Sequence, residues 1–212
     1  MKVRLKTITP NAEAEMIEMA RVSNPANQSN PEYATLLRSC LRRGHWSVFE
    51  MANAVVEVDT TRAISAQMIR HRSFTFQEFS QRYADVRELP APDVPELRSP
   101  HPTNRQSSVP FTGTDTLKSI LENRIAHHFQ EGLDLYADLM ESGVAKEVAR
   151  DVLPLSMPTR LYINGTIRSW IHYLEARTYE GAQKEHREVA LAIRDVLAPE
   201  LPVLARAAGW VS

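Results

Sequence analysis

A cluster of prolines between residues 90 and 110 most constrains the fold of this 212-residue chain. Six of the 13 prolines stand there, at positions 90, 92, 95, 100, 102 and 110. Proline lacks a backbone N–H and fixes φ, so this density opposes both helices and central strands. The sequence therefore predicts an irregular excursion at about 85–113, flanked by regular elements. A loop of this length in a compact domain is usually functional or disordered.

Apolar spacing outside the excursion predicts many helices and a small sheet. Alternation favours strands at 2–8, 53–61 and 159–165, and helical spacing favours helices at 12–22, 31–43, 62–71, 114–142, 145–153, 166–176, 180–196 and 200–210. Asn30 and Pro31 resemble a helix start, and Gly44 and Gly143 stand where helix C-caps belong. We expect an α+β fold: one helix-rich domain over residues 1–212, with a small, mostly antiparallel sheet.

Composition narrows the class of protein. Hydrophobic residues make up 43% and charged residues 24%, and the net charge of -1 leaves no overall electrostatic footprint for nucleic acid. The single cysteine, Cys40, excludes an internal disulfide and fits a reducing compartment. The N-terminus lacks the apolar core of a signal peptide, and no apolar run could span a bilayer. We expect a cytoplasmic protein that binds neither membranes nor nucleic acid.

The stretch IRHRSFTFQEFSQRY, residues 69–83, concentrates groups that bind anions. Arg70 and Arg72 stand at the expected end of a helix, where their side chains can diverge toward two neighbouring anions. If 73–83 is extended, Glu78, Ser80 and Arg82 share one face and form a hydrogen-bonding strip for a polar, phosphate-bearing ligand. The alternative is a solvated charged edge above three core phenylalanines.

Other chemical groups give weaker signals. His127, His128 and Glu131 suggest a metal, but adjacent histidines point to different faces of a helix and no third ligand follows at fixed spacing. Ser80 has no Asp–His pair at recognisable spacing, so we interpret it as a binding hydroxyl. Cys40 lies among leucines, where a cysteine is most often a small buried hydrophobic residue.

Four segments, taken in chain order, match the motifs of one known family. They are GHWSVFE at 44–50, RHR at 70–72 followed after seven residues by Ser80, Arg82 and Tyr83, SGVAKEVARDVLPLSMPTRLY at 142–162, and GTIRSWIHYLEAR at 165–177 with Ala182, Gln183 and Glu185 beyond it. In these segments the chain resembles the flavin-dependent thymidylate synthases. That family methylates dUMP to dTMP, takes the one-carbon unit from methylenetetrahydrofolate, and uses FAD reduced by NADPH. Its α+β subunits form homotetramers whose active sites are formed between subunits.

The resemblance implies a role for each matched residue. Arg177 matches the catalytic arginine, which stabilises negative charge developing on the uracil ring. The implied dUMP contacts are Gln67, Arg70, Glu78, Ser80, Gln81, Arg82, Arg150 and Arg177. The implied FAD contacts are His45, Ser47, Arg70, His71, Arg72, Glu78, Thr166, Ile167, Arg168 and His172. Thr166 stands where many members have asparagine.

The second hypothesis is a nucleotide- or RNA-binding module. A bound flavin, seen as yellow colour, would distinguish the enzyme from such a module.

Overall fold

The structure is a computed structural model that describes residues 1–211, and the chain forms two compact units. The first unit comprises Met1–Asp59, Met68–Gln77 and the chain from Leu161 onward. The second comprises Thr60–Gln67 and Glu78–Arg160, and includes the proline-rich excursion. The chain passes between the units near the ends of strands, and each unit is described separately below.

The first unit is built on a four-stranded sheet in the order β1-β2-β6-β3. The strands are β1 (Lys2–Ile8), β2 (Asn53–Thr61), β3 (Thr75–Glu78) and β6 (Pro158–Thr166). β1 and β2 are antiparallel, with Lys2 opposite Asp59 and Ile8 opposite Ala54. In β6, buried Leu161 and Ile163 alternate with exposed Tyr162 and Asn164, as expected when one face of a sheet meets a core. The three strands predicted from alternation are confirmed.

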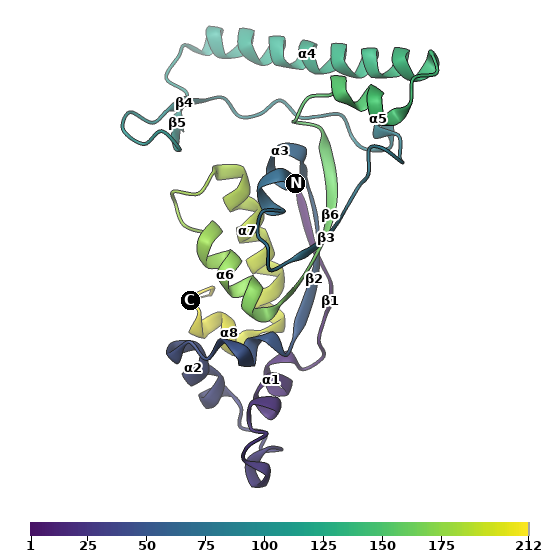
Figure 1. Ribbon diagram of the computed structural model, residues 1–212. Helices are drawn as coiled ribbons and strands as arrows, with labels where there is room; N and C mark the ends of the chain where they lie inside the picture. The colour runs from purple at the N-terminus through teal and green to yellow at the C-terminus, as the bar shows by residue number, and fades with distance from the viewer. Residues whose placement is uncertain (212) are drawn as a thin grey trace. The chain divides into compact units, whose positions relative to one another are not determined.

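The first unit also contains helices and short turns. They are α1 (Ala12–Ala20), α2 (Ala34–Arg43), α6 (Ile167–Arg177), α7 (Lys184–Leu197) and α8 (Pro202–Ala207), with 3-10 turns η1 (Pro25–Asn27), η2 (Trp46–Glu50) and η5 (Ala198–Glu200). α7 packs on β1 and against α6, and α2 packs against α8 (Figure 1). The side chains of Trp170 and Tyr173, both on α6, are among the largest that are fully buried. This burial explains why α6 is helical although aromatic residues have only moderate helix propensity.

The helix predicted at 31–43 begins later than expected, at Ala34. The Asn30 side chain accepts a hydrogen bond from the backbone N–H of Glu32, and the Arg21 guanidinium donates to the carbonyl oxygens of both Asn30 and Glu32. These bonds hold the segment in a turn, because they use backbone groups that a longer helix would need. The end is as predicted: Gly44 is the C-cap, with φ of 68°.

The second unit is organised around one long helix. Its elements are α3 (Arg62–Met68, which ends at the unit boundary), η3 (Val86–Glu88), β4 (Arg98–Pro100), β5 (Ser108–Pro110), α4 (Asp115–Glu141), α5 (Lys146–Ala149) and η4 (Arg150–Val152). α4 starts at its cap Thr114 and packs against α5 (Figure 1), where Val86, Tyr136, Ala149 and Met157 form a small core. Between residues 85 and 113 the chain is irregular except for the 3-10 turn η3 and the antiparallel β4–β5 hairpin.

The fold is therefore helix-rich α+β with a small antiparallel sheet, as the sequence predicts. Within residues 1–211, no helix has the length and apolar character needed to cross a bilayer.

Candidate functional site

The two arginines of the segment RHR at 70–72 point into solvent, while the histidine between them points inward. α3 ends at Met68, and the backbone N–H of His71 donates to the Met68 carbonyl at 3.0 Å, which turns the chain. Arg70 and Arg72 are exposed and make no hydrogen bond or ion pair with any residue in 1–211. Both guanidinium groups are therefore available to external anions, and neither is needed to hold the fold.

His71 lies in an aromatic cluster of the first unit. Its ring is 4.7 Å from that of Phe74 and meets the ring of Tyr173 edge-on at 5.6 Å. Phe74 in turn lies against Gly165 of β6, because a Cβ at that position would overlap its ring. The glycine thus permits the approach that places Phe74 beneath His71.

Burial and the charge of Arg177 determine the protonation of the histidines in this cluster. Burial first, and then the charge of Arg177, lowers the pKa of His71, and the same two causes lower the pKa of buried His186 to about 4. His172 also lowers the pKa of His71. Both imidazoles are therefore neutral near pH 7, and Arg177 supplies the positive charge of the cluster.

Two predicted dUMP contacts carry buried polar atoms that have no hydrogen-bond partner in the described part of the chain. They are Nε of Arg177, at the end of α6, and Nε2 of Gln81, whose residue is 7% exposed. Buried donors are nearly always paired in folded proteins, so each unpaired one needs an explanation. A bound polar ligand is such an explanation for both.

The predicted strip of Glu78, Ser80 and Arg82 does not form. β3 ends at Glu78, and the carbonyl of Ser80 accepts hydrogen bonds from the backbone N–H groups of Tyr83 (3.0 Å) and Ala84 (2.9 Å). These bonds close a turn, so the residues do not alternate along an extended chain. The prediction of an extended 73–83 is wrong at its start, where the Phe74 N–H donates to the His71 carbonyl and closes a turn, and again beyond Phe79, whose N–H still donates to the Arg160 carbonyl.

The second unit nevertheless links several predicted dUMP residues through Glu147. Arg82 donates to Oε2 of Glu147 from Nε (3.2 Å) and Nη2 (2.9 Å), and Nε of Arg150 donates to the Glu147 carbonyl at 3.3 Å. All three side chains are at least partly exposed. The sequence analysis did not single out Glu147, although it lies within the quoted segment 142–162.

The predicted FAD residues of the first unit meet where α6 faces η2. Arg168 forms an ion pair with Glu50, and the His172 ring contacts Trp46 edge-on at 4.5 Å. His45 and Ser47 flank Trp46 and are exposed. Two motifs separated by about 120 residues are thus held together by one ion pair and one ring contact.

Two residues of the predicted FAD set stabilise the start of α6. Thr166 is the N-cap of α6, where its hydroxyl accepts from the Ser169 N–H at 3.2 Å. Ile167 is fully buried, and its N–H donates to the Ala52 carbonyl. Their contacts with a flavin stay predictions.

The predicted residues divide between the two units. The second unit contains Gln67, Glu78, Ser80, Gln81, Arg82 and Arg150. The first unit contains His45, Ser47, Arg70, His71, Arg72, Thr166, Ile167, Arg168, His172 and Arg177.

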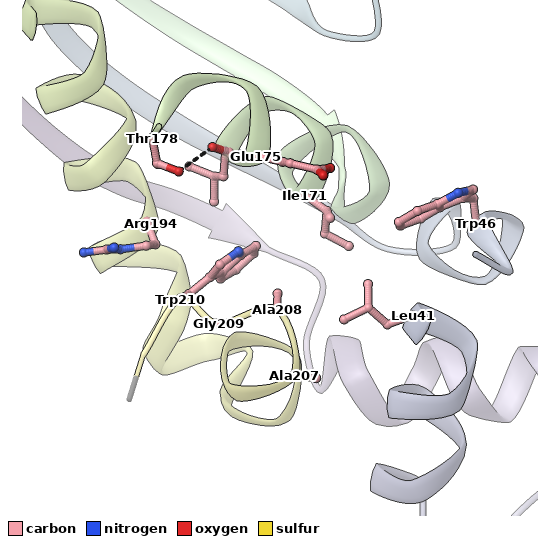
Figure 2. Close-up of a pocket in the computed structure, with 11 residues that line it drawn as sticks. Leu41, Trp46, Ile171, Glu175, Thr178, Arg194, Ala207, Ala208, Gly209 and Trp210 are labelled. Carbon is pink, nitrogen blue, oxygen red and sulfur yellow. Dashed lines mark hydrogen bonds between the residues drawn. The ribbon is translucent and has the colours of Figure 1, made fainter. Parts of the chain in front are cut away.

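A cavity of about 330 Å³ in the first unit lies beside these residues but is lined by none of them. Figure 2 shows Trp46 at one end, Trp210 and Arg194 at the other, and Leu41 and Ile171 between them. Thr178, the neighbour of Arg177, also lines it and donates its hydroxyl proton to the Leu174 carbonyl at 2.7 Å. The sequence analysis assigned Trp46 no role.

In the described part of the chain, no group of three or more histidine, cysteine or acidic side chains is placed so that it could hold a metal ion. His127 and Glu131 form an exposed pair on α4, with 3.4 Å between Nε2 and Oε1.

Comparison with known proteins gives consistent matches over most of the chain. The family model described as "Thymidylate synthase complementing protein" matches residues 4–203. A probable flavin-dependent thymidylate synthase of Paramecium bursaria Chlorella virus 1 is 45% identical over 94% of this chain and 92% of its own length. A flavin-dependent thymidylate synthase of Synechocystis sp. is 46% identical over 90% of this chain and 86% of its own.

A solved structure shares the fold across the whole chain. The UMP/dUMP methylase PolB from Streptomyces cacaoi, bound with 5-Br UMP, is 26% identical and matches with a TM-score of 0.83 over 100% of this chain and 96% of its own. With the family model spanning residues 4–203 and relatives above 40% identity, this chain belongs to the flavin-dependent thymidylate synthase family.

Proposed function

We propose that this protein converts dUMP to dTMP by reductive methylation. Methylenetetrahydrofolate is the one-carbon donor, and FAD reduced by NADPH is the source of the hydride. The observation that carries the proposal is that Arg177 in the first unit and Gln81 in the second, both matched to dUMP contacts, each hold a buried donor with no partner among residues 1–211. Family membership makes a uracil nucleotide the ligand expected for those donors.

The reaction places specific demands on the site. A bond forms between the methylene carbon and C5 of uracil, the bond from that carbon to the folate nitrogen breaks and releases tetrahydrofolate, the C5 proton leaves, and a hydride completes the methyl group. FAD held by the residues assigned to it would supply that hydride, having taken two electrons from NADPH. Negative charge develops on the uracil carbonyl and N3 edge, and the Arg177 guanidinium stabilises it. A preorganised donor of this kind typically contributes about 3–4 kcal/mol.

The residues of the first unit fit a flavin dinucleotide. Arg70 and Arg72 offer two unpaired guanidinium groups, which suit the oxygens of a pyrophosphate. His71 offers a neutral imidazole fixed by Phe74 and Tyr173. A neutral ring can donate or accept a hydrogen bond without adding charge beside Arg177.

We further propose that the protein is a homotetramer in the cytoplasm, with active sites formed between subunits. The resemblance to the family supports this assembly. Exposed apolar side chains in the second unit, including Tyr83 (87% exposed) and Leu155 (73% exposed), are consistent with surfaces covered by other subunits.

The test is a reconstitution of the complete reaction. The purified protein is incubated with dUMP, methylenetetrahydrofolate, FAD and NADPH, and dTMP is measured by chromatography, with each component omitted in turn. We expect product only in the complete mixture. A parallel reaction with UMP is included because the solved relative is named a UMP/dUMP methylase. A protein that retains no FAD and forms no product contradicts the proposal.

A further inference from the structure

Glu78, at the end of β3, is held by three donors that converge on a single carboxylate oxygen. Oε1 of Glu78 accepts from the Ser65 hydroxyl at 2.8 Å and from the Thr159 hydroxyl at 2.9 Å. Nη1 of Arg62 forms an ion pair with the same oxygen at 2.8 Å. All four residues belong to the second unit.

The donors are themselves fixed by the fold. Ser65 and Thr159 are each 1% exposed, so neither hydroxyl can turn to water instead. Arg62 and Ser65 are three apart on α3 and therefore face the same way. The start of α3 is tied to the chain before β6, because the N–H of Arg62 donates to the Met157 carbonyl (2.9 Å) and that of Ala63 to the Leu155 carbonyl (3.0 Å). These bonds set the positions of Arg62 and Ser65 relative to Thr159.

The second oxygen of Glu78, Oε2, has no partner among residues 1–211. The side chain is 20% exposed, so the carboxylate is not sealed inside the protein. A carboxylate can accept about four hydrogen bonds, two at each oxygen. Because three donors hold Oε1 in place, Oε2 points in a fixed direction. It can therefore accept a hydrogen bond from a ligand.

We propose that Arg62, Ser65 and Thr159 are positioning residues that aim Oε2 of Glu78 at a hydroxyl or N–H donor of the bound nucleotide. A carboxylate repels phosphate, so Glu78 contacts the sugar or base of dUMP, and the phosphate is left to arginines. The inference rests on the proposed function in that dUMP is taken as the ligand. None of the three positioning residues matches a family motif position considered above.

The experiment measures dUMP affinity of the FAD-loaded protein by isothermal titration in Ser65→Ala, Thr159→Val and Arg62→Gln. We expect about a three- to tenfold rise in the dissociation constant for each lost hydroxyl and about tenfold for Arg62→Gln. In turnover, KM for dUMP rises while kcat at saturating dUMP is largely kept. The resemblance also implies an FAD contact for Glu78, but this inference aims Oε2 at the nucleotide alone, so FAD affinity, titrated into the stripped variants, stays within about twofold of wild type.

The same substitutions are repeated in a Glu78→Ala background, because residues that act through Glu78 lose their effect when the carboxylate is gone. We expect further changes below about twofold there. Equal effects in both backgrounds, or a loss of FAD affinity as large as that of dUMP, overturn the inference.

Thr61→Val is the matched control. The Thr61 hydroxyl caps α3 by accepting from the Ile64 N–H at 3.4 Å and does not touch Glu78. The Thr61→Val variant should have lower thermal stability and unchanged dUMP affinity. If this variant binds dUMP more weakly, dUMP affinity depends on the stability of α3 and not on the orientation of the Glu78 carboxylate. Wild-type turnover separates the two proposals. If wild type forms dTMP and the variants bind dUMP normally, only this inference fails, and if wild type neither binds nor methylates dUMP, both fail.

Discussion

Tyr173 and His186 form a buried hydrogen bond inside the first unit, with 3.1 Å between the tyrosine Oη and His186 Nε2. Each residue is 1% exposed. Burial raises the pKa of Tyr173 and lowers that of His186 to about 4, so both partners are neutral near pH 7. The pair joins α6 to α7 directly beneath His71, whose ring contacts Tyr173.

This neutral histidine makes stability depend on pH. The pKa of histidine is about 6.5 in an unfolded chain and about 4 for His186 in the fold, so the unfolded state binds more protons between these values. Its contribution is present above about pH 6.5 and is lost as the pH falls toward 4. We expect roughly 2 kcal/mol of the free energy of unfolding to be lost between pH 7 and pH 5.

The check is urea unfolding of wild type and His186→Gln at both pH values, with the free energies compared. The variant should lose distinctly less than wild type on acidification. His127→Gln is the control, because His127 is an exposed residue of α4 whose side chain is 76% exposed. An identical pH dependence in wild type and His186→Gln would contradict the assignment.

Arg70→Ala and Arg72→Ala should each weaken FAD binding by about one to two decades, because each removes a charge-assisted hydrogen bond. Thermal stability should be unchanged, since neither guanidinium has a partner in residues 1–211. The measurement is a titration of FAD into the stripped proteins. Exposed Arg124, on α4, serves as the control through Arg124→Ala. Wild-type FAD affinity in both motif variants would exclude their role.

Arg177→Ala should reduce dTMP formation far more than flavin content. Its unpaired Nε is assigned to uracil, and removal of one such donor typically lowers kcat by about 10²–10³-fold. Flavin absorbance per chain and single-turnover dTMP formation are measured on the same preparation. If colour and turnover disappear together, Arg177 has a structural role instead.

Cys40→Ser should keep most of its turnover. Cys40 is 4% exposed on α2, and burial raises the pKa of its thiol, which therefore stays protonated at neutral pH. The substitution should lower the free energy of unfolding by about 1 kcal/mol through a more polar buried group. A folded, yellow Cys40→Ser protein without product would indicate a covalent thiol mechanism.

Sedimentation should show a tetramer at micromolar concentration. The active sites that we propose to lie between subunits would require the assembly, so dilution that dissociates it should abolish turnover in parallel. A monomer with full activity would contradict the proposed assembly.

The sequence by itself determined the features of this protein that depend on residues close together in the chain. Strand alternation at 2–8 and 53–61, the C-cap at Gly44 and the proline-rich excursion each depend on neighbours along the chain, and the structure confirms all three. The four motifs likewise indicated the family, because their letters and order need no knowledge of contacts. Burial of Cys40 followed from its apolar helix neighbours.

Tertiary structure decided what depends on distant partners. The turn at Ser80 replaced the predicted strip because its carbonyl accepts two nearby N–H groups once β3 has paired only as far as Phe79. Spacing could not reveal that Ser65 and Thr159, 94 residues apart, share one oxygen of Glu78. Nor could it show that His186 would be neutral, since its pKa is set by burial under α6 and by the charge of Arg177. Desolvation and convergent hydrogen bonding exist only after the chain has folded, which is why these features were invisible in the sequence.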